Sequence, residues 1–576
     1  FAITPTELVS AVEFYRGPAS VLSGQTPPGG AANIVTKKPL PEAFTDLTAT
    51  VDQHSQRKLA LDYNSGRFGE GTLPAAVRFN AVVEDSDTFR DDVEREVGVL
   101  APAITLDLSQ RTRLTLEANL IDWEATDDRG LPLFGADSDE AATRRFDQSD
   151  FVLGTTDQVN DREEERFMVD LSHEFNDHLT TNLQISYGET ERSQLAVFPA
   201  AINPANGLLV RSHFGTRDEF ESLDARLDTE FRFETGPVSH TGIAALQFRE
   251  FERRDEFTGF VQQADQIDPD DPPSDSPFLG FGPGRGLEVD QGSTELFLQD
   301  RLRVNEGPLS GFFTVVGVRH IAFEDDLDSE RDEDENTWRL GLGYTPPAAR
   351  WLTVYANYAE SFDPQSGVTA AGEPLPPSEG EQTELGIKAS LFDANLLLTA
   401  AVFDLERSDV GVVNPADPRS QVAVGTQENQ GLELEAVGQL TEHLRLRAQY
   451  THNDSDISDD PQFGGNELQL TPDDSASVWL THDAVPLPGN RSGLSVGGGL
   501  VYVGDRFATT ENAIELSSYG RLDLKAGYEF GDSTSIDLNI KNVTDEDYFV
   551  GGNTFGLGSV LPGQTRTLAL ELTHRF

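Results

Sequence analysis

The chain has 576 residues, and its 99 acidic residues outnumber its 43 lysines and arginines, so the formal net charge is −56 at pH 7. This balance excludes nucleic acid as the expected partner, because phosphate binding requires concentrated basic side chains. The sequence contains no cysteine, which excludes disulfides, thiolate metal sites and cysteine nucleophiles.

The most irregular segment of the chain lies in its first 40 residues. The stretch VEFYRGPASVLSGQTPPGGAANIVTKKP, residues 12–39, holds four glycines and four prolines between short strand-like pieces, and nothing similar recurs. The residues before it lack the charged and apolar regions of a signal peptide. We therefore interpret the sequence as a mature or truncated product.

From about residue 45 onward, segments of roughly ten residues alternate apolar with polar side chains. RTRLTLEANL (111–120), for example, places leucines and an alanine on one face and Thr115, Glu117 and Asn119 on the other. A period of two predicts β-strands. We predict twenty-two strands, at 45–54, 57–65, 76–85, 95–107, 111–122, 165–175, 179–190, 218–232, 237–252, 290–303, 312–323, 337–345, 351–360, 382–389, 395–407, 429–438, 444–452, 474–482, 493–503, 519–528, 533–541 and 565–575.

The predicted connections alternate between short turns and long, acidic loops. Turns include 108–110, 175–178, 440–443 and 529–532, whereas loops include 123–164, 191–217, 253–289 and 542–564. This alternation is typical of transmembrane barrels. No apolar run reaches the ~18 residues of a membrane-spanning helix. We therefore predict an all-β fold, a 22-stranded antiparallel transmembrane β-barrel.

The last predicted strand supports the same fold. TRTLALELTHRF places Leu568, Leu570 and Leu572 on one face and ends at Phe576. A C-terminal aromatic residue that closes an alternating strand resembles the assembly signal of outer-membrane barrels.

No pattern of catalytic residues is present, so we do not expect an enzyme. The histidines show no HExxH spacing, and neither GxSxG nor a P-loop occurs. The acidic runs 265–276 and 323–336 lack the glycine and terminal glutamate of a calcium loop, and we predict no metal site. We interpret these runs as a solvated extracellular face.

Aromatic residues on the long loops have two interpretations. They line a ligand vestibule, since binding sites are apolar concavities, or they form the aromatic belt of the bilayer interface. The candidate vestibule residues are Trp123, Arg129, Phe134, Phe198, Phe214, Phe257 and Phe362.

The stretch at 12–39 resembles the end of the plug domain in TonB-dependent siderophore receptors. The matching motif residues include Gly17, Pro18, Gly24, Gly29, Gly30 and Asn33, whereas Ser23 stands where the family usually has tyrosine. Later segments resemble the family in family order, with similarity to ferrichrome and hydroxamate receptors. They are 128–135, 352–365, 375–388, 401–410, 429–436, 501–507 and 538–549.

The resemblance implies that residues 1–43 are the C-terminal part of a plug domain and that 44–576 are a barrel in the cell outer membrane. It implies import of a ferric siderophore, with iron carried in the ligand and no covalently bound cofactor. The expected partners are the TonB–ExbB–ExbD complex and outer-membrane lipid and lipopolysaccharide, and we expect a monomer. The TonB box is absent from this sequence. Alternatives are import of a cobalamin or oligosaccharide, or a porin-like or adhesin-like barrel.

The resemblance also implies an ion cluster between plug and barrel. In related receptors the plug arginine that matches Arg16 meets glutamates that match Glu384 and Glu433. A guanidinium enclosed in a lumen requires pairing, because breaking a buried ion pair costs on the order of 3–5 kcal/mol. We therefore predict a cluster of Arg16, Glu384 and Glu433.

Overall fold

The computed structural model describes most of the chain. The described residues are 4–18, 24–69, 71, 73–133, 159–260, 265–268, 286, 288–325, 331–365, 367–414, 420–485, 493–553 and 557–576.

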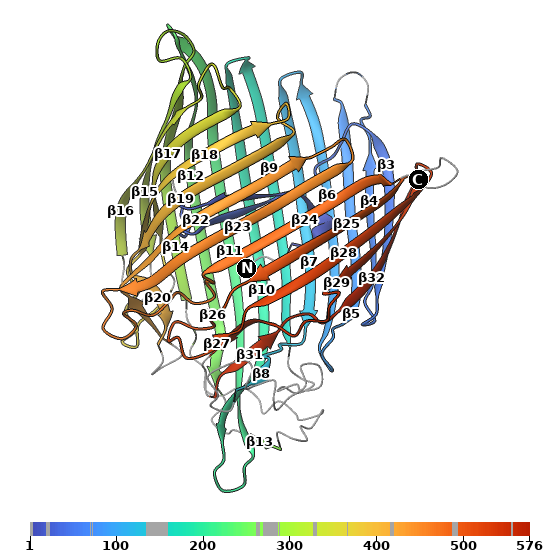
Figure 1. The fold of residues 1–576 in the computed structure, drawn as a ribbon, viewed down its shortest axis with the longest axis vertical. Coiled ribbons are helices and arrows are strands. Elements are labelled where there is room, and N and C mark those ends of the chain that lie inside the picture. Colours follow the sequence, from blue (N-terminus) through green and yellow to red (C-terminus); the bar gives the residue numbers. More distant parts are fainter. Residues whose placement is uncertain are drawn as a thin grey trace.

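Twenty-two antiparallel strands close into one barrel (Figure 1), which confirms the predicted fold class. Each strand pairs with its neighbours in chain order, and β32 pairs with β3 to complete the ring. The strands are β3 Ala43–Asp52, β4 Arg57–Ser65, β5 Ala75–Asp87, β6 Glu94–Ser109, β7 Thr112–Ala125, β9 Asn160–Asn176, β10 Leu179–Ile202, β11 Leu209–Thr235, β12 Val238–Phe260, β14 Glu288–Val304, β15 Phe312–Asp325, β16 Arg331–Tyr344, β17 Leu352–Asp363, β18 Ser378–Leu391, β19 Leu396–Arg407, β22 Thr426–Gln439, β23 Leu444–Ser458, β24 Asp474–Val485, β25 Leu494–Val503, β28 Tyr519–Phe530, β29 Thr534–Lys541 and β32 Thr567–Arg575.

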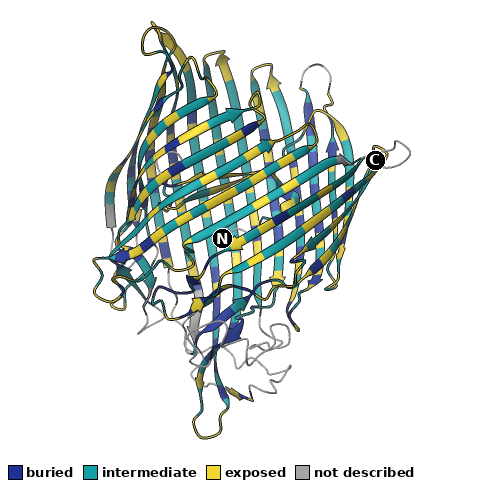
Figure 2. Ribbon diagram, in the orientation of Figure 1, coloured by how far each residue is buried: buried dark blue, intermediate teal, exposed yellow. Residues whose placement is uncertain are grey.

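Side chains alternate between the membrane and the lumen along each strand. On β32, Leu568, Leu570 and Leu572 are 40%, 45% and 43% exposed. Leu570 pairs across the closing seam with Val51 of β3, which is also exposed. The alternation is visible as bands of exposed and less exposed residues (Figure 2). Exposed leucines are stable in this position because the surrounding solvent is hydrocarbon.

The three longest strands far exceed the length that a membrane crossing requires. β10, β11 and β12 contain 24, 27 and 23 residues, whereas a tilted strand crosses the bilayer in ~9–11 residues. They extend beyond the barrel wall at the long-loop end, and the short β13 (Asp265–Ile267) pairs with the start of β11 (Figure 1). The predicted strand at 218–232 was therefore too short, because β11 begins at Leu209.

The segments that we predicted as long loops contain further small sheets. They are β8 (Leu131–Pro132) with β31 (Ser559–Pro562) and β30 (Phe549–Asn553), β20 (Val410–Val413) with β21 (Gln421–Val424), and β26 (Arg506–Phe507) with β27 (Glu515–Leu516). An apolar cluster joins five of the long-loop segments and includes Leu131, Leu209, Ile267, Leu516 and Val560. All of these sheets lie at the lower end of the barrel in Figure 1.

An N-terminal hairpin lies inside the barrel and outside its sheet. It comprises β1 (Val9–Arg16) and β2 (Gly30–Thr36), preceded by the 3-10 turn η1 (Thr6–Leu8) (Figure 1). Among the described residues, no helix is long and apolar enough to cross a membrane. The hairpin pairs with no barrel strand, because β1 and β2 form a two-stranded sheet of their own.

Candidate functional site

The start of the hairpin is fixed to the inner wall of the barrel by one apolar and one polar contact. Leu8 is 2% exposed and packs against inward-facing alanine, valine and isoleucine side chains of β4, β5, β6 and β7. Glu7 forms an ion pair with Lys58 on β4. Burial of one leucine contributes about 1.5–3 kcal/mol, so Leu8 is a substantial part of this attachment.

The end of the hairpin is fixed by the two consecutive lysines that follow β2. Lys37 Nζ lies 3.0 Å from Asp62 Oδ2 on β4, and Lys38 Nζ lies 2.6 Å from Asp170 Oδ2 on β9. Lys38 also lies 3.6 Å from Glu117 on β7. Adjacent residues of an extended chain point in opposite directions, so the lysine pair reaches two separate parts of the wall.

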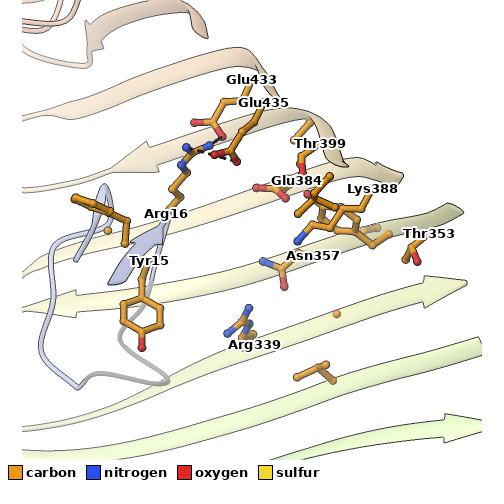
Figure 3. Close-up of a pocket in the computed structure, with 18 of the residues that line it drawn as sticks. Tyr15, Arg16, Arg339, Thr353, Asn357, Glu384, Lys388, Thr399, Glu433 and Glu435 are labelled. Carbon is orange, nitrogen blue, oxygen red and sulfur yellow. Dashed lines mark hydrogen bonds and ion pairs between the residues drawn. The ribbon is translucent and has the colours of Figure 1, made fainter. Parts of the chain in front are cut away.

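Arg16, the last residue of β1, contacts the wall at β22. Its Nη1 lies 2.9 Å from Glu433 Oε2 and its Nη2 lies 3.9 Å from Glu435 Oε2 (Figure 3). Glu384 lines the same cavity on β18 but forms no ion pair with Arg16 in the described part of the chain. The expected second partner is thus replaced by Glu435, which faces inward because it is two residues from Glu433.

The Arg16 side chain is 48% exposed to the lumen, so the sequence-based comparison with a buried ion pair was wrong. We expect a double-mutant cycle of Arg16→Ala and Glu433→Gln to give a coupling of about 0.2–1 kcal/mol. The measurement is denaturant-induced release of the hairpin, followed by a dye on Ser10→Cys, since the chain has no other cysteine. Arg57→Ala on the outer surface is the control. A coupling near 3 kcal/mol between Arg16 and Glu433 would contradict the conclusion that this ion pair is exposed.

Two motif glycines are required by close contacts with the wall. Gly17 has φ = 73°, and a Cβ there would overlap the side chain of Gln382 on β18. Gly24 has φ = 82°, and its Cβ would lie 2.8 Å from the guanidinium of Arg249 and the carboxylate of Glu295. Glycine alone adopts these angles without strain and leaves this space.

The other motif residues stabilise the hairpin itself. Gly30 has φ = 119°, and a Cβ there would overlap a backbone carbonyl of β1 rather than the wall. A Cβ at Gly29 would have no neighbour within 4 Å. Pro18 is buried, and Asn33 Nδ2 donates to Glu13 Oε2 at 3.0 Å across the two strands. Neither glycine is therefore required by a close contact with the wall.

Three of the predicted vestibule residues lie together at the long-loop end. The Arg129 guanidinium lies 4.7 Å from the centre of the Phe198 ring, and Phe198 meets Phe214 edge to face at 6.4 Å. Asp127 Oδ2 accepts a hydrogen bond of 2.8 Å from Arg129. A cation held over an aromatic face presents charge and apolar surface together, which suits recognition of a polar ligand with a ring system.

Trp123 and Phe362 do not join this group. Trp123 packs beside the apolar patch that holds Leu8. Phe362 is 2% exposed and packs against Ile321 and Phe323, so it belongs to the core. Phe134 and the side chain of Phe257 lie outside what the structure describes.

A second aromatic and charged group, which was not predicted from the sequence, lies on the long-loop extensions of β10, β11 and β12. Phe220 lies between the guanidinium groups of Arg192 and Arg253, at 5.4 and 5.6 Å, and Arg192 pairs with Asp218. Arg253 Nε lies 2.7 Å from Asp255 Oδ1. The sequence held one signal for this group. Its residues occupy every second, inward-facing position of their strands, and this alternation continues beyond the apolar membrane band.

The pKa of Asp255 is raised to about 6 in this group. Burial is the main cause and outweighs the opposing effect of Arg253, and the neighbouring Asp218 raises the pKa further. Outward neighbours of Asp255 on β12 are Glu252 and Arg254, so this segment lies outside the membrane. Protonation of Asp255 near pH 6 therefore makes this part of the lumen more positive.

A buried ion network lies where the hairpin loop approaches the wall at Gly24. Arg319 Nη1 lies 2.5 Å from Glu295 Oε2, and the two side chains are 1% and 0% exposed. Arg249 joins the network at 3.6 Å from Glu295 and 2.9 Å from Asp224. The network therefore determines the charge of the inner barrel wall next to the backbone of Gly24.

A cavity of about 1360 Å³ separates the hairpin from β14 to β23 at the short-turn end. Tyr15 and Arg16 border it from the hairpin, and Arg339, Asn357 and Lys388 border it from the wall (Figure 3). Within the described residues, no group of three or more His, Asp or Glu side chains is placed to hold a metal ion.

A wide barrel whose lumen holds a separately folded segment defines the class of plugged outer-membrane receptors. The family model described as "TonB dependent receptor-like, beta-barrel" matches residues 101–543. The chain therefore belongs to this TonB-dependent receptor family, and its barrel lies in the bacterial outer membrane.

Known proteins resemble the chain over nearly its full length. A metal-pseudopaline receptor of Pseudomonas aeruginosa is 28% identical over 99% of this chain and 80% of the relative. The ferrioxamine B receptor of Salmonella typhimurium is 27% identical over 94% of this chain and 77% of the relative. The solved closed form of the ferric-catecholate import receptor Fiu of Escherichia coli has a TM-score of 0.86 at 22% identity, and the match covers 99% of this chain and 87% of that one. This last similarity shows that the two proteins share a fold.

Proposed function

We propose that this protein imports ferric siderophores across the outer membrane. The observation that carries the proposal is a hairpin attached at both ends inside a barrel of the TonB-dependent receptor family. A 22-stranded barrel encloses a lumen that requires a plug. The siderophores named for its relatives include ferrichrome and ferrioxamine, which supports this class of cargo over a cobalamin or an oligosaccharide.

The proposal assigns a separate role to each part of the chain. Residues 1–43 form the C-terminal part of the plug, and 44–576 form the barrel; the first barrel strand, β3, begins one residue before this boundary, at Ala43. Iron enters as part of the ligand rather than as a bound cofactor. Energy comes from the TonB–ExbB–ExbD complex of the inner membrane. The vestibule of Arg129, Phe198 and Phe214 receives the ligand.

The experiment that tests the proposal is growth on iron-chelated medium supplied with single ferric siderophores. A strain that carries the full-length gene is compared with a deletion strain and with the same gene in a tonB-deficient background. We expect at least one siderophore to restore growth only when both the gene and tonB are present. Equal growth in all three strains on every siderophore would contradict the proposal. Growth that requires the gene but not tonB would instead favour a passive porin.

A further inference from the structure

A hydroxyl, an imidazole and a carboxylate meet beside the short turn between β11 and β12. Thr235 Oγ1 lies 2.8 Å from His240 Nε2, and His240 Nδ1 lies 2.6 Å from Asp300 Oδ2 on β14. A hydroxyl bonded to a base, with the base oriented by a third group, is the arrangement of hydrolases that act through a covalent acyl intermediate. The sequence alone does not reveal this group, because Asp300 lies 60 residues from His240.

The two contacts determine which ring nitrogen of His240 carries the proton. An ionised carboxylate only accepts hydrogen bonds, so the contact with Asp300 places the proton of the neutral imidazole on Nδ1. Nε2 is then free to accept the hydrogen bond of the Thr235 hydroxyl. Asp300 Oδ1 is buried and has no hydrogen-bond partner among the described residues, so His240 is the group that this carboxylate serves. The carboxylate therefore stabilises the imidazolium that forms when His240 removes the proton of Thr235.

The surroundings of the three side chains suit this chemistry. Thr235 is exposed, whereas His240 and Asp300 are mostly buried. The ring of Phe233 stacks on the His240 imidazole, with the ring centres 4.3 Å apart and the planes at 7°, which holds the base in one orientation. Gly236 follows Thr235 with φ = 60°, and its N–H donates to no backbone carbonyl of the described residues. That N–H is available to an oxyanion formed beside Thr235.

The group lies on the lipid-facing surface of the barrel. His240 shares one face of β12 with Leu246 and Phe248, which are exposed, because the three positions differ by even numbers. Toward the long loops, the first charged residue on this face is Glu250, ten residues from His240. Ten residues of a tilted strand rise roughly 25 Å, which is the height of the apolar band. His240 therefore lies at the edge of the band on the side of the short turns, which face the periplasm.

We propose that Thr235, His240 and Asp300 form a hydrolase site for the fatty-acyl esters of membrane phospholipids. These esters join the acyl chains to the headgroup, so they lie at the boundary between hydrocarbon and headgroup. The group occupies that boundary in the periplasmic leaflet, and the bilayer itself presents the ester to Thr235. The site faces lipid rather than the lumen, so its activity is separate from import.

The proposed reaction proceeds in two steps. In the first, Thr235 Oγ1 attacks the ester carbonyl carbon while its proton passes to His240 Nε2. The ester C–O bond then breaks, and the lysophospholipid leaves with that proton and with the electron pair of the broken bond. In the second, water attacks the acyl-threonine, His240 takes the water proton and returns it to Thr235 Oγ1, and the fatty acid leaves. The net reaction consumes one water for each ester.

Two other threonine and histidine pairs on the outer surface provide matched controls. Thr112 Oγ1 lies 2.8 Å from His173 Nδ1, and Thr534 Oγ1 lies 2.8 Å from His574 Nδ1. Both pairs lie near short turns, and among the described residues neither histidine forms an ion pair with a carboxylate. They reproduce the hydroxyl and the imidazole without the orienting group. Replacement of Thr112 therefore tests the loss of a hydrogen bond at the same interface.

The test is hydrolysis of phospholipid by the purified full-length receptor. The receptor is reconstituted in vesicles of phosphatidylethanolamine and phosphatidylglycerol with radiolabelled acyl chains, and released fatty acid and lysophospholipid are measured. An alkyl fluorophosphonate is the covalent probe, and the labelled residue is located by mass spectrometry. The variants are Thr235→Ala, Thr235→Ser and Asp300→Asn, with Thr112→Ala as the control. The electrophoretic mobility of unheated samples shows that each barrel is folded.

We expect the wild type to release fatty acid and the probe to label Thr235. Thr235→Ala and Asp300→Asn are expected to lower the rate by at least about 100-fold and to abolish labelling at this position. Thr235→Ser retains the hydroxyl and Thr112→Ala retains the site, so both are expected to keep the activity and the labelling. Three results would overturn the proposal: no release by the folded wild type above protein-free vesicles, an unchanged rate in Thr235→Ala, or an equal loss in Thr112→Ala.

Discussion

Replacing Glu295 by alanine is expected to lower the free energy of unfolding of the barrel by about 3–5 kcal/mol. Glu295 is fully buried and pairs with Arg319, which is 1% exposed. Removal of the carboxylate breaks this buried ion pair and takes a charged partner from a guanidinium in a low-dielectric site. Arg249, the other cation near Glu295, adds repulsion. This is the largest effect expected of a single substitution in the described part of the lumen.

The measurement is denaturant-induced unfolding of the full-length receptor in detergent micelles. Glu288→Ala is the matched control, because Glu288 is 80% exposed and lies 3.7 Å from Arg254; an exposed pair of this kind contributes about 0–1 kcal/mol. The double variant Glu295→Leu and Arg319→Met is expected to recover much of the loss, because it removes both charges. A Glu295→Ala effect as small as that of the control would contradict the buried network.

Replacing Gly17 by valine is expected to displace the hairpin from the wall. A Cβ at this position overlaps the Gln382 side chain, and φ = 73° is strained for a β-branched residue. Together these effects oppose the closed arrangement by at least about 2–3 kcal/mol, which is tenfold or more in the population of displaced hairpins. We expect displacement of the hairpin to widen the open part of the lumen.

Single-channel conductance in planar bilayers and sensitivity of cells to bulky antibiotics both report this opening. Gly29→Val is the matched control in the same motif, since a Cβ there meets no atom within 4 Å. Gln382→Ala is expected to restore part of the closure in Gly17→Val by removing the overlap. Equal conductance of the Gly17 and Gly29 variants would show that the contact at Gly17 does not hold the hairpin.

Sequence periodicity was sufficient to place every barrel strand, because each crossing alternates lipid-facing apolar residues with lumen-facing polar ones. The strand ends were less predictable. Beyond the bilayer, outward positions such as Glu219 and Glu221 on β11 are charged, so the apolar alternation disappears while the hydrogen-bonded pairing with β10 and β12 continues. Loop sheets were also missed, since short pairings such as β8 with β31 depend on contacts distant in sequence.

The site was predictable where the motif itself sets the geometry. Gly17 and Gly24 occupy positions that only glycine fits, and Arg16 contacts Glu433. The sequence could not predict whether Glu384 or Glu435 is the second partner of Arg16. Both glutamates face the lumen, and the depth at which the hairpin lies in the barrel determines which of them Arg16 reaches. The role of Leu8 was also hidden, since the apolar patch that receives it is built from inward positions of four different strands.

The import of a ferric siderophore is tested most directly by energised uptake. Cells that carry the full-length gene as their single siderophore receptor are supplied with radiolabelled ferric siderophores, with and without collapse of the proton-motive force. The structure and family predict accumulation of at least one complex that stops on collapse, while its binding to the cell surface continues. Accumulation that is unaffected by the collapse, or none above a deletion strain for any ferric siderophore, would contradict a plugged, TonB-driven importer.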